Sequence, residues 1–149
     1  MQRYMNDVAV QPMTKRTYID ANLLIAAWHG KDDAGMAAMA ILEDGGRTLL
    51  VSDALWLEVM PKAIYQQQKN EIAFYQTIFQ CAEHGFWRIE VRQQAHNLAQ
   101  RYGIAAMDSI HVATALAMGA DEFVSGEKPT KPMFRVTELS ITSLRSSTP

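Results

Sequence analysis

Residues 102–125 have the sequence YGIAAMDSIHVATALAMGADEFVS and carry the clearest structural signal in the chain. The alanine-rich part, 107–118, predicts a helix, and Gly119 closes it as a C-terminal stop residue. The apolar run 123–125 follows almost at once and predicts a short strand. A helix that leads directly into a buried strand is typical of a parallel sheet covered by helices.

The rest of the chain repeats this alternation of short apolar runs and amphipathic stretches. Further strands are predicted at 17–19, 48–51, 86–91 and, at the sheet edge, 141–144. Further helices are predicted at 22–28, 32–45, 53–68, 70–83 and 92–102, with Ser52 and Asn70 as N-caps and Pro61 as a kink. The pattern predicts an α/β fold with a parallel sheet covered on both faces.

Composition narrows the class of protein. The chain has 149 residues, of which 48% are hydrophobic, so one domain with a sizeable core is expected. No run of about 18 apolar residues is present, so we expect no membrane span and a cytoplasmic location. Cys81 cannot form an internal disulfide and is interpreted as a small core residue. The net charge of −2 does not by itself indicate nucleic-acid binding.

Acidic side chains follow two of the predicted strands. Asp20 joins the strand 17–19 to the next helix, and Glu127 comes two residues after the strand 123–125. Ligands of open parallel sheets bind beyond the carboxyl ends of the strands, so both acids are candidate site residues. Taken alone, Asp20 is equally explained as a helix N-cap. Asp121 precedes its strand and is expected at the opposite end, in a turn or capping role.

Two more candidate acids lie within helices. Glu58 stands among apolar neighbours in SDALWLEVMPKAIY, and a half-buried carboxylate is costly unless it is paired or binds a cation. Asp108 lies in the first turn of the helix 107–118. The alternative for Glu58 is an ordinary exposed glutamate. The alternative for Asp108 is a carboxylate that only stabilises the N-terminus of its helix. His111 shares the face of Asp108 and is interpreted as packed or hydrogen-bonded rather than as a metal ligand.

These acids predict a particular chemistry if they converge. Clustered carboxylates repel one another without cations, and hard oxygen ligands select Mg²⁺ or Mn²⁺. Such ions polarise a phosphodiester and activate water, so the sequence indicates metal-assisted phosphodiester hydrolysis. A phosphatase or another carboxylate hydrolase is the alternative, although Asn22 stands where a haloacid-dehalogenase-type phosphatase has its second aspartate.

Over residues 17–144 the chain resembles the PIN-domain family. The stretch 102–125 resembles the third-acid helix and the strand after it, and TYIDANLLIAA resembles the first-acid motif. The surroundings of Glu58 resemble the second-acid motif more loosely. The resemblance implies a single-domain three-layer α/β/α sandwich with a central parallel sheet of about five strands. We therefore predict an N-terminal arm at 1–16, a PIN-like nuclease domain at 17–145 and a C-terminal tail at 146–149.

The resemblance also implies an endoribonuclease, dependent on Mg²⁺ or Mn²⁺, that hydrolyses RNA. The family's catalytic and metal-binding acids and its supporting polar residues map onto Asp20, Glu58, Asp108, Glu127, Asn22 and Ser125. Stand-alone PIN domains of this size resemble the toxin of a toxin–antitoxin pair, the VapC-like group, which implies a homodimer and a small antitoxin partner. The stretch SGEKPTKPMF departs from the family pattern, which often has a second Asp and a Phe there. A PIN-fold module that binds RNA or protein and cuts weakly or not at all is therefore the alternative.

Large apolar side chains are frequent between residues 51 and 79. They include Trp56, Met60, Tyr65, Phe74 and Tyr75. The two helices predicted there have more apolar surface than one core needs, and exposed apolar patches often mark interfaces. We expect a symmetric homodimer that uses this region, with an antitoxin docking nearby; internal packing of these side chains is the alternative.

Overall fold

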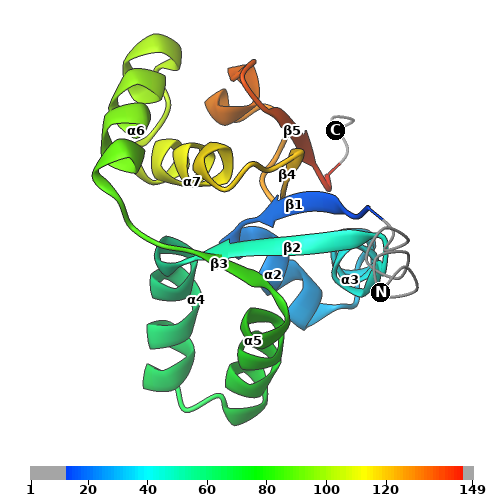
Figure 1. Cartoon of the computed structure of the whole chain (residues 1–149). Coiled ribbons are helices and arrows are strands. Elements are labelled where there is room, and N and C mark those ends of the chain that lie inside the picture. Colours follow the sequence, from blue (N-terminus) through cyan, green and yellow to red (C-terminus); the bar gives the residue numbers. More distant parts are fainter. Residues whose placement is uncertain (1–12, 146–149) are drawn as a thin grey trace, which may run out of the picture.

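Five parallel strands form one sheet, in the order β3-β2-β1-β4-β5. They belong to a computed structural model that describes residues 13–145 (Figure 1). The strands are β1 (Lys15–Ile19), β2 (Arg47–Ser52), β3 (Glu83–Gly85), β4 (Glu122–Ser125) and β5 (Ser140–Ser143). The predicted parallel sheet of about five strands is confirmed. Most of the predicted arm, residues 1–12, and the predicted tail, 146–149, lie outside the described residues.

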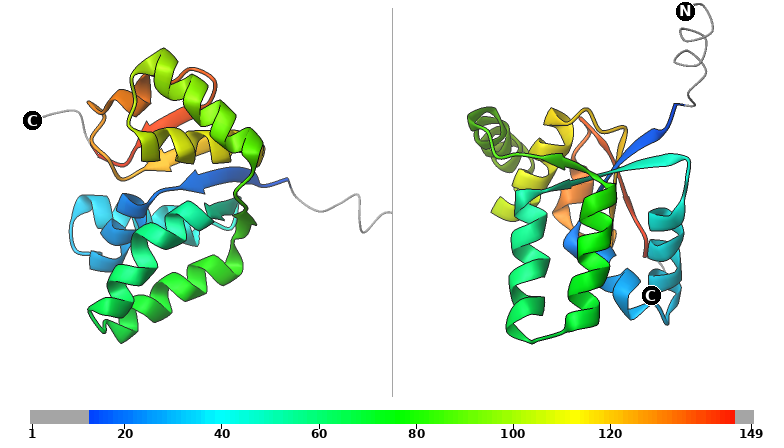
Figure 2. Two further views of the ribbon diagram at one scale, coloured as in Figure 1. Left: turned by 90° about the vertical axis from the view of Figure 1, so that its left-hand side faces the viewer. Right: turned by 60° about the horizontal axis from the view of Figure 1, so that its bottom comes forward.

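Helices cover both faces of this sheet, which confirms the three-layer α/β/α sandwich (Figures 1 and 2). One layer contains α2 (Ala21–His29), α3 (Asp33–Glu43), α4 (Asp53–Tyr65) and α5 (Lys69–Cys81). The other contains α6 (Ile89–Tyr102), α7 (Ala106–Ala117) and the short 3₁₀ helix η1 (Pro132–Arg135). No helix within residues 13–145 is long and apolar enough to cross a membrane.

The two layers are held by two cores, and the pleat of the strands divides side chains between them. Tyr18 packs in the core beneath α6 and α7, whereas its neighbour Ile19 packs in the core beneath α2 to α5. Phe123 and Val124 of β4 divide in the same way. This explains why the strands are apolar at successive positions rather than alternately, since both faces are buried.

The order in which the chain adds strands to the sheet reverses between β1 and β4. From β1 the chain adds β2 and β3 on one side, and then returns to add β4 and β5 on the other. The carboxyl ends of β1 and β4 therefore open onto the crevice where ligands of such sheets bind. Asp20 follows β1 and Gly126 follows β4, so both lie at that crevice.

Side-chain caps start three of the helices. Ser52 accepts a hydrogen bond from the backbone N–H of Leu55 at 3.2 Å, as predicted, and Asp32 accepts one from Gly35 at 2.8 Å. The expectation that Asn70 caps α5 is wrong. That helix begins one residue earlier, after Gln68, without a side-chain cap hydrogen bond.

The third strand also differs from its prediction at 86–91. β3 covers residues 83–85, and the apolar run after it forms a loop and the start of α6. Phe86 and Trp87 are exposed, so these two hydrophobic side chains are not buried in the sheet as a strand there would require. Glu83 is instead fixed by two hydrogen bonds from the guanidinium of Arg16, at 2.8 and 2.9 Å. Cys81, interpreted as a core residue, is exposed at the end of α5.

The expected apolar surplus of α4 and α5 is not found at most of the side chains named for it. Met60 and Tyr75 are buried, and Trp56 and Phe74 pack against the same core. Of the five side chains named from the sequence, only Tyr65 is largely exposed, at 88%. The interpretation is therefore wrong for the other four, because two antiparallel helices over one sheet face bury more of their surface than the sequence pattern suggested. α4 continues through the proline at position 61.

Candidate active site

Asp20 is the central side chain of the crevice between β1 and β4. It is buried, and its Oδ1 accepts hydrogen bonds from the backbone N–H groups of Leu23 at 2.9 Å and Gly126 at 3.1 Å. Its Oδ2 accepts a hydrogen bond from the hydroxyl of Ser125. The carboxylate thus caps α2, as the simpler interpretation expected, and is also fixed by the end of β4. The N-cap interpretation of Asp20 is confirmed, and its role as a site residue stays a prediction.

Gly126 is required for this arrangement because β4 passes very close to α2. A Cβ at position 126 would lie 2.4 Å from the carbonyl carbon of Asn22 and 2.6 Å from the backbone nitrogen of Leu23. Both atoms belong to the backbone and cannot move aside without shifting the helix. The missing side chain therefore lets the N–H of Gly126 reach Asp20.

Burial raises the pKa of Asp20 above its ordinary value. The hydrogen bonds from Ser125, Gly126 and Leu23 oppose this rise, and so does His111 when it is protonated. A carboxylate that has lost its water but has no paired cation is an unfavourable group. A bound proton or a cation against the carboxylate would relieve that cost.

Asp108 adds a second carboxylate from the other layer. It lies in the first turn of α7 and is partly buried. Burial raises its pKa, and the negative charges of Glu127 and Glu58 raise it further, whereas Lys131 and His111 lower it. Asp108 is therefore close enough to Glu127 and Glu58 for their charges to influence its pKa.

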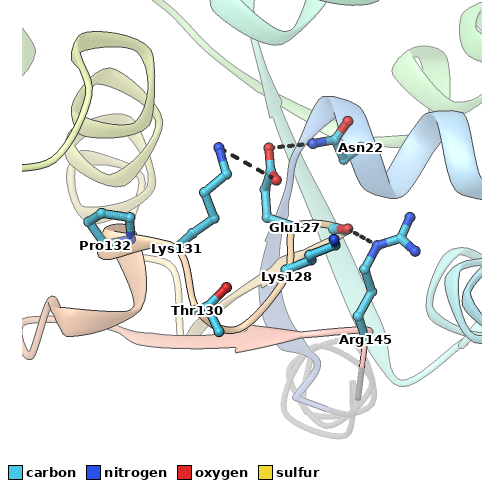
Figure 3. Close-up of a pocket in the computed structure, with 8 residues that line it drawn as sticks. Asn22, Glu127, Lys128, Thr130, Lys131, Pro132 and Arg145 are labelled. Carbon is cyan, nitrogen blue, oxygen red and sulfur yellow. Dashed lines mark hydrogen bonds and ion pairs between the residues drawn. The ribbon is translucent and has the colours of Figure 1, made fainter. Parts of the chain in front are cut away.

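Glu127 is held by residues of α2 and of its own loop. The side-chain amide of Asn22 donates to Oε1, and Nζ of Lys131 lies 3.7 Å from Oε2 (Figure 3). The backbone N–H of Glu127 donates to the hydroxyl of Ser125 at 2.9 Å, and that hydroxyl in turn donates to Asp20. Ser125 therefore links two of the predicted acids through a single oxygen.

Glu58 reaches the crevice from α4 and pairs with His111 of α7. Its carboxylate contacts Nε2 of the imidazole. On the other side of the ring, Nδ1 lies 2.7 Å from the hydroxyl of Tyr18, which lies 2.6 Å from the hydroxyl of Ser52. The interpretation of His111 as a hydrogen-bonded residue is confirmed, and Glu58 is the partner that the sequence did not reveal.

In the chain of hydrogen bonds through His111, each group can donate to the next one, so that no donor or acceptor in the chain lacks a partner. If His111 is neutral with its proton on Nε2, the backbone N–H of Leu55 donates to Ser52, Ser52 to Tyr18, Tyr18 to Nδ1, and Nε2–H to Glu58. Burial raises the pKa of the Tyr18 hydroxyl, which therefore stays a donor. Sequence reasoning missed Tyr18, and it expected Ser52 only as the N-cap of α4, not as a hydrogen-bond partner of Tyr18.

The donor set fits a hard divalent cation bound by few protein ligands. Within residues 13–145, no three His, Cys, Asp or Glu side chains converge tightly enough to bind one ion by themselves. Mg²⁺ usually keeps several waters and takes one or two carboxylates together with substrate phosphates, rather than a protein cage. Asp20 and Asp108 both lie near His111, which lowers the pKa of each when it is protonated, and two carboxylates are as many protein ligands as this mode of binding needs.

Acids at the other end of the sheet have a different role. Asp121 accepts a hydrogen bond from the backbone N–H of Arg16 at 2.8 Å, at the amino end of β1. Next to it, Glu122 is buried and accepts hydrogen bonds from Thr17 at 2.7 Å and Arg47 at 3.0 Å. The expectation that Asp121 lies away from the site is confirmed.

Comparison with protein families supplies the assignment that geometry alone does not. The sequence profile of the PIN domain family matches residues 17–129. The chain belongs to the PIN domain family. The matched range runs from within β1 to the loop after β4, and so includes the four acids predicted from the sequence.

Solved structures of other proteins share this fold at low sequence identity. A toxin–antitoxin complex from Klebsiella pneumoniae contains a chain with 21% identity and a TM-score of 0.60, over 84% of this chain and 99% of that one. VapBC2 from Rickettsia felis, bound to a promoter DNA fragment, gives 13% identity and a TM-score of 0.66, over 86% and 98%. VapBC-1 from nontypeable Haemophilus influenzae gives 15% and 0.63, over 87% and 98%. No curated protein matches the chain.

Proposed function

We propose that this PIN domain is a divalent-metal-dependent endoribonuclease that hydrolyses phosphodiester bonds of RNA. The observation that carries the proposal is the placement of Asp20 at the switch point of the sheet, buried and oriented by donors from β4 and α2. Membership of the PIN domain family supports the same chemistry. The mild net charge of −2 is no obstacle, because cations bound at the acids would offset them.

The residues divide into different tasks. Asp20 and Asp108 would hold Mg²⁺ or Mn²⁺, which supplies Lewis acidity to the scissile phosphate and to the attacking water. Glu58, fixed by His111, would complete the site directly or through a water. Ser125 orients Asp20, and Asn22 orients Glu127 in a looser, outer position.

A cleavage assay tests this function against its alternatives. Structured RNA is incubated with the protein and Mn²⁺, and then with a chelator, with Asp20→Asn as the inactive control. Cutting that needs both the metal and Asp20 supports the proposal. RNA binding without cutting would instead assign a PIN-fold binding module, an alternative that the pairing of Glu127 with Lys131 keeps open. Turnover of a small phosphate ester alone would assign a phosphatase.

We further propose that the protein is the toxin of a toxin–antitoxin pair, located in the cytoplasm. The similar structures from three bacteria are toxin–antitoxin complexes or carry VapBC names, which supports a small antitoxin partner here. Co-expression with the product of the neighbouring open reading frame tests this. Loss of RNA cleavage on complex formation is expected, and a neighbour that neither binds nor inhibits would contradict it.

A homodimer is the remaining part of the proposal. Leu57, Pro61 and Ile64 are exposed at helical spacing along α4, and Tyr65 lies beside them. This stripe is the part of the predicted apolar surplus that the fold leaves uncovered, and such stripes are typical of interfaces. Light scattering should give twice the mass of one chain at micromolar concentration. A monomer under those conditions, or a dimer unaffected by Ile64→Glu, would contradict this interface.

A further inference from the structure

A cavity of about 630 Å³ lies beside the acidic crevice. Its walls come from the start of α2, from the loop 126–132 after β4, and from Arg145 just after β5 (Figure 3). These segments are far apart in the sequence, and β4 and β5 bring them together as neighbouring strands. None of this cavity was anticipated from the sequence, because basic residues there carry no distinctive spacing.

The cavity is basic although the whole chain is acidic. Lys128, Lys131 and Arg145 line it, with Glu127 as its one acidic residue. Lys131 faces Glu127 at 3.7 Å. Nε of Arg145 donates to the carbonyl oxygen of Gly126 at 2.6 Å, which fixes the guanidinium. Neither Nη of Arg145 nor Nζ of Lys128 has a hydrogen-bond or ion-pair partner among residues 13–145, so both cations are available to an anion.

The cavity and the proposed metal site share the same peptide segment. Gly126 donates its N–H to Asp20 and accepts the hydrogen bond from Arg145 with its carbonyl. Glu127 and Asn22 line both places. Lys131 is the positive charge that lowers the pKa of Asp108 most. An anion in the cavity would therefore lie close to the segment that orients Asp20.

We propose that Lys128 and Arg145, assisted by Lys131, bind a backbone phosphate of the RNA strand adjacent to the scissile one. The inference rests on the proposed ribonuclease function and names how its substrate is held. A guanidinium with two free nitrogens matches phosphate geometry, and an ammonium adds an adaptable point charge. The described lining contains no aromatic side chain on which a base could stack, so the site recognises the backbone and not the sequence.

Steady-state kinetics on a short RNA oligonucleotide with Mn²⁺ test the site. The variant Lys128→Ala/Arg145→Ala should raise KM about tenfold, the value of one charge-assisted contact, while kcat changes little. The control Lys69→Ala/Arg92→Ala removes two exposed cations from α5 and α6, and so changes net charge equally. Its KM should stay near the parent value. The salt dependence of oligonucleotide binding should weaken by about 0.7 in slope only in the first variant.

A scan with single methylphosphonates locates the contact. Neutralising one phosphate beside the cleaved bond should raise KM for the parent and for the control, and should add nothing in Lys128→Ala/Arg145→Ala. Parental KM in that variant, with RNA still cut, would overturn the phosphate site and leave the ribonuclease intact. Absence of RNA cleavage by the parent would overturn the proposed function and the site with it. Binding of an acidic peptide that is lost in the variant, with KM for RNA unchanged, would assign the cavity to a protein partner and overturn the inference.

Discussion

Gly126 donates its backbone N–H to Oδ1 of Asp20 at 3.1 Å, although 106 positions separate the two residues in the sequence. The contact exists because β1 and β4 are neighbours in the sheet and because position 126 has no Cβ. The orientation of the buried carboxylate of Asp20 therefore depends on how closely the backbone at Gly126 approaches the backbone of α2. Small changes at this glycine should therefore reach the candidate active site.

Gly126→Ala should destabilise the fold and disturb Asp20 together. The added Cβ meets backbone atoms of Asn22 and Leu23 within 2.6 Å, so the loop must move away from α2. Overpacking of this kind costs about 1–3 kcal/mol of the free energy of unfolding. Urea unfolding measures it, and Gly45→Ala is the control because a Cβ added at position 45 would meet no atom within 4 Å. Equal stability of the two variants would contradict the close approach.

Asp20→Asn should raise the melting temperature in the absence of metal. Burial raises the pKa of Asp20, so the folded state holds this proton more tightly than the unfolded chain does. Stability is therefore lost as pH rises from the ordinary carboxyl range through the folded-state pKa, and the amide avoids this loss. The gain should be present at pH 7 and small near about pH 4. Mn²⁺ should stabilise the parent and not the variant; the reverse would exclude Asp20 as a metal ligand.

Glu127→Gln should cost far less activity than Asp20→Asn. Glu127 is already engaged by Asn22 and by Lys131, and its longer side chain lies in a loop. The amide keeps the hydrogen bond from Asn22 within reach, whereas Asp20→Asn removes the charge that the buried donors orient. We expect a loss of less than about tenfold for Glu127→Gln, and of several orders of magnitude for Asp20→Asn. RNA cleavage at saturating Mn²⁺ compares the two variants. A lower rate for Glu127→Gln than for Asp20→Asn would show that Glu127 matters more for cleavage than Asp20.

The position of Asp20 could be predicted because its signals are local. An apolar strand, one acid and a helix follow each other directly, and the parallel topology fixes which edge of the sheet they share. The helix that carries Asp108 was equally clear from its alanine-rich pattern. In both cases the residues that determine the structure are neighbours in the sequence.

Other features depend on contacts between distant segments. The partner of Glu58 is His111 on a different helix, and neither residue's neighbours indicate the other. The strand expected at 86–91 failed because Phe86 and Trp87 are exposed, and hydrophobicity alone does not distinguish a buried strand from an uncovered loop. Arg145 reaches the site only because β5 pairs with β4.

Glu122→Gln should weaken the fold at neutral pH and flatten its acid dependence. Burial pushes the pKa of Glu122 up, but hydrogen bonds from Thr17, Arg47 and Lys15 outweigh it, and the net pKa is lowered from 4.5. The stabilisation is therefore present above pH 4.5 and is lost as pH falls through the lower folded-state pKa. At pH 7 the variant should lose about 2 kcal/mol. Urea unfolding across pH measures this, with exposed Glu43→Gln as control; parallel pH profiles for Glu122→Gln and the parent would refute it.

Tyr18→Phe should destabilise the protein more than Tyr75→Phe, although both rings are fully buried and both changes remove one oxygen. The hydroxyl of Tyr18 lies between His111 and Ser52, and both of these groups are buried. Its removal leaves Nδ1 of His111 and the hydroxyl proton of Ser52 without their partner, which costs about 1–3 kcal/mol. The hydroxyl of Tyr75 donates to Glu71 at 2.6 Å, and that carboxylate is partly exposed and can turn to water.

The same comparison tests whether Tyr18 supports the candidate active site. Without its hydroxyl, Nδ1 of His111 loses the donor that fixes the imidazole, and Glu58 loses a rigid partner. RNA cleavage by Tyr18→Phe should therefore fall in kcat while KM stays near the parent value, and Tyr75→Phe should change neither. Equal losses of unfolding free energy in the two variants would show that the hydroxyl network adds nothing to the fold. Full kcat in Tyr18→Phe would show that Glu58 is positioned without it.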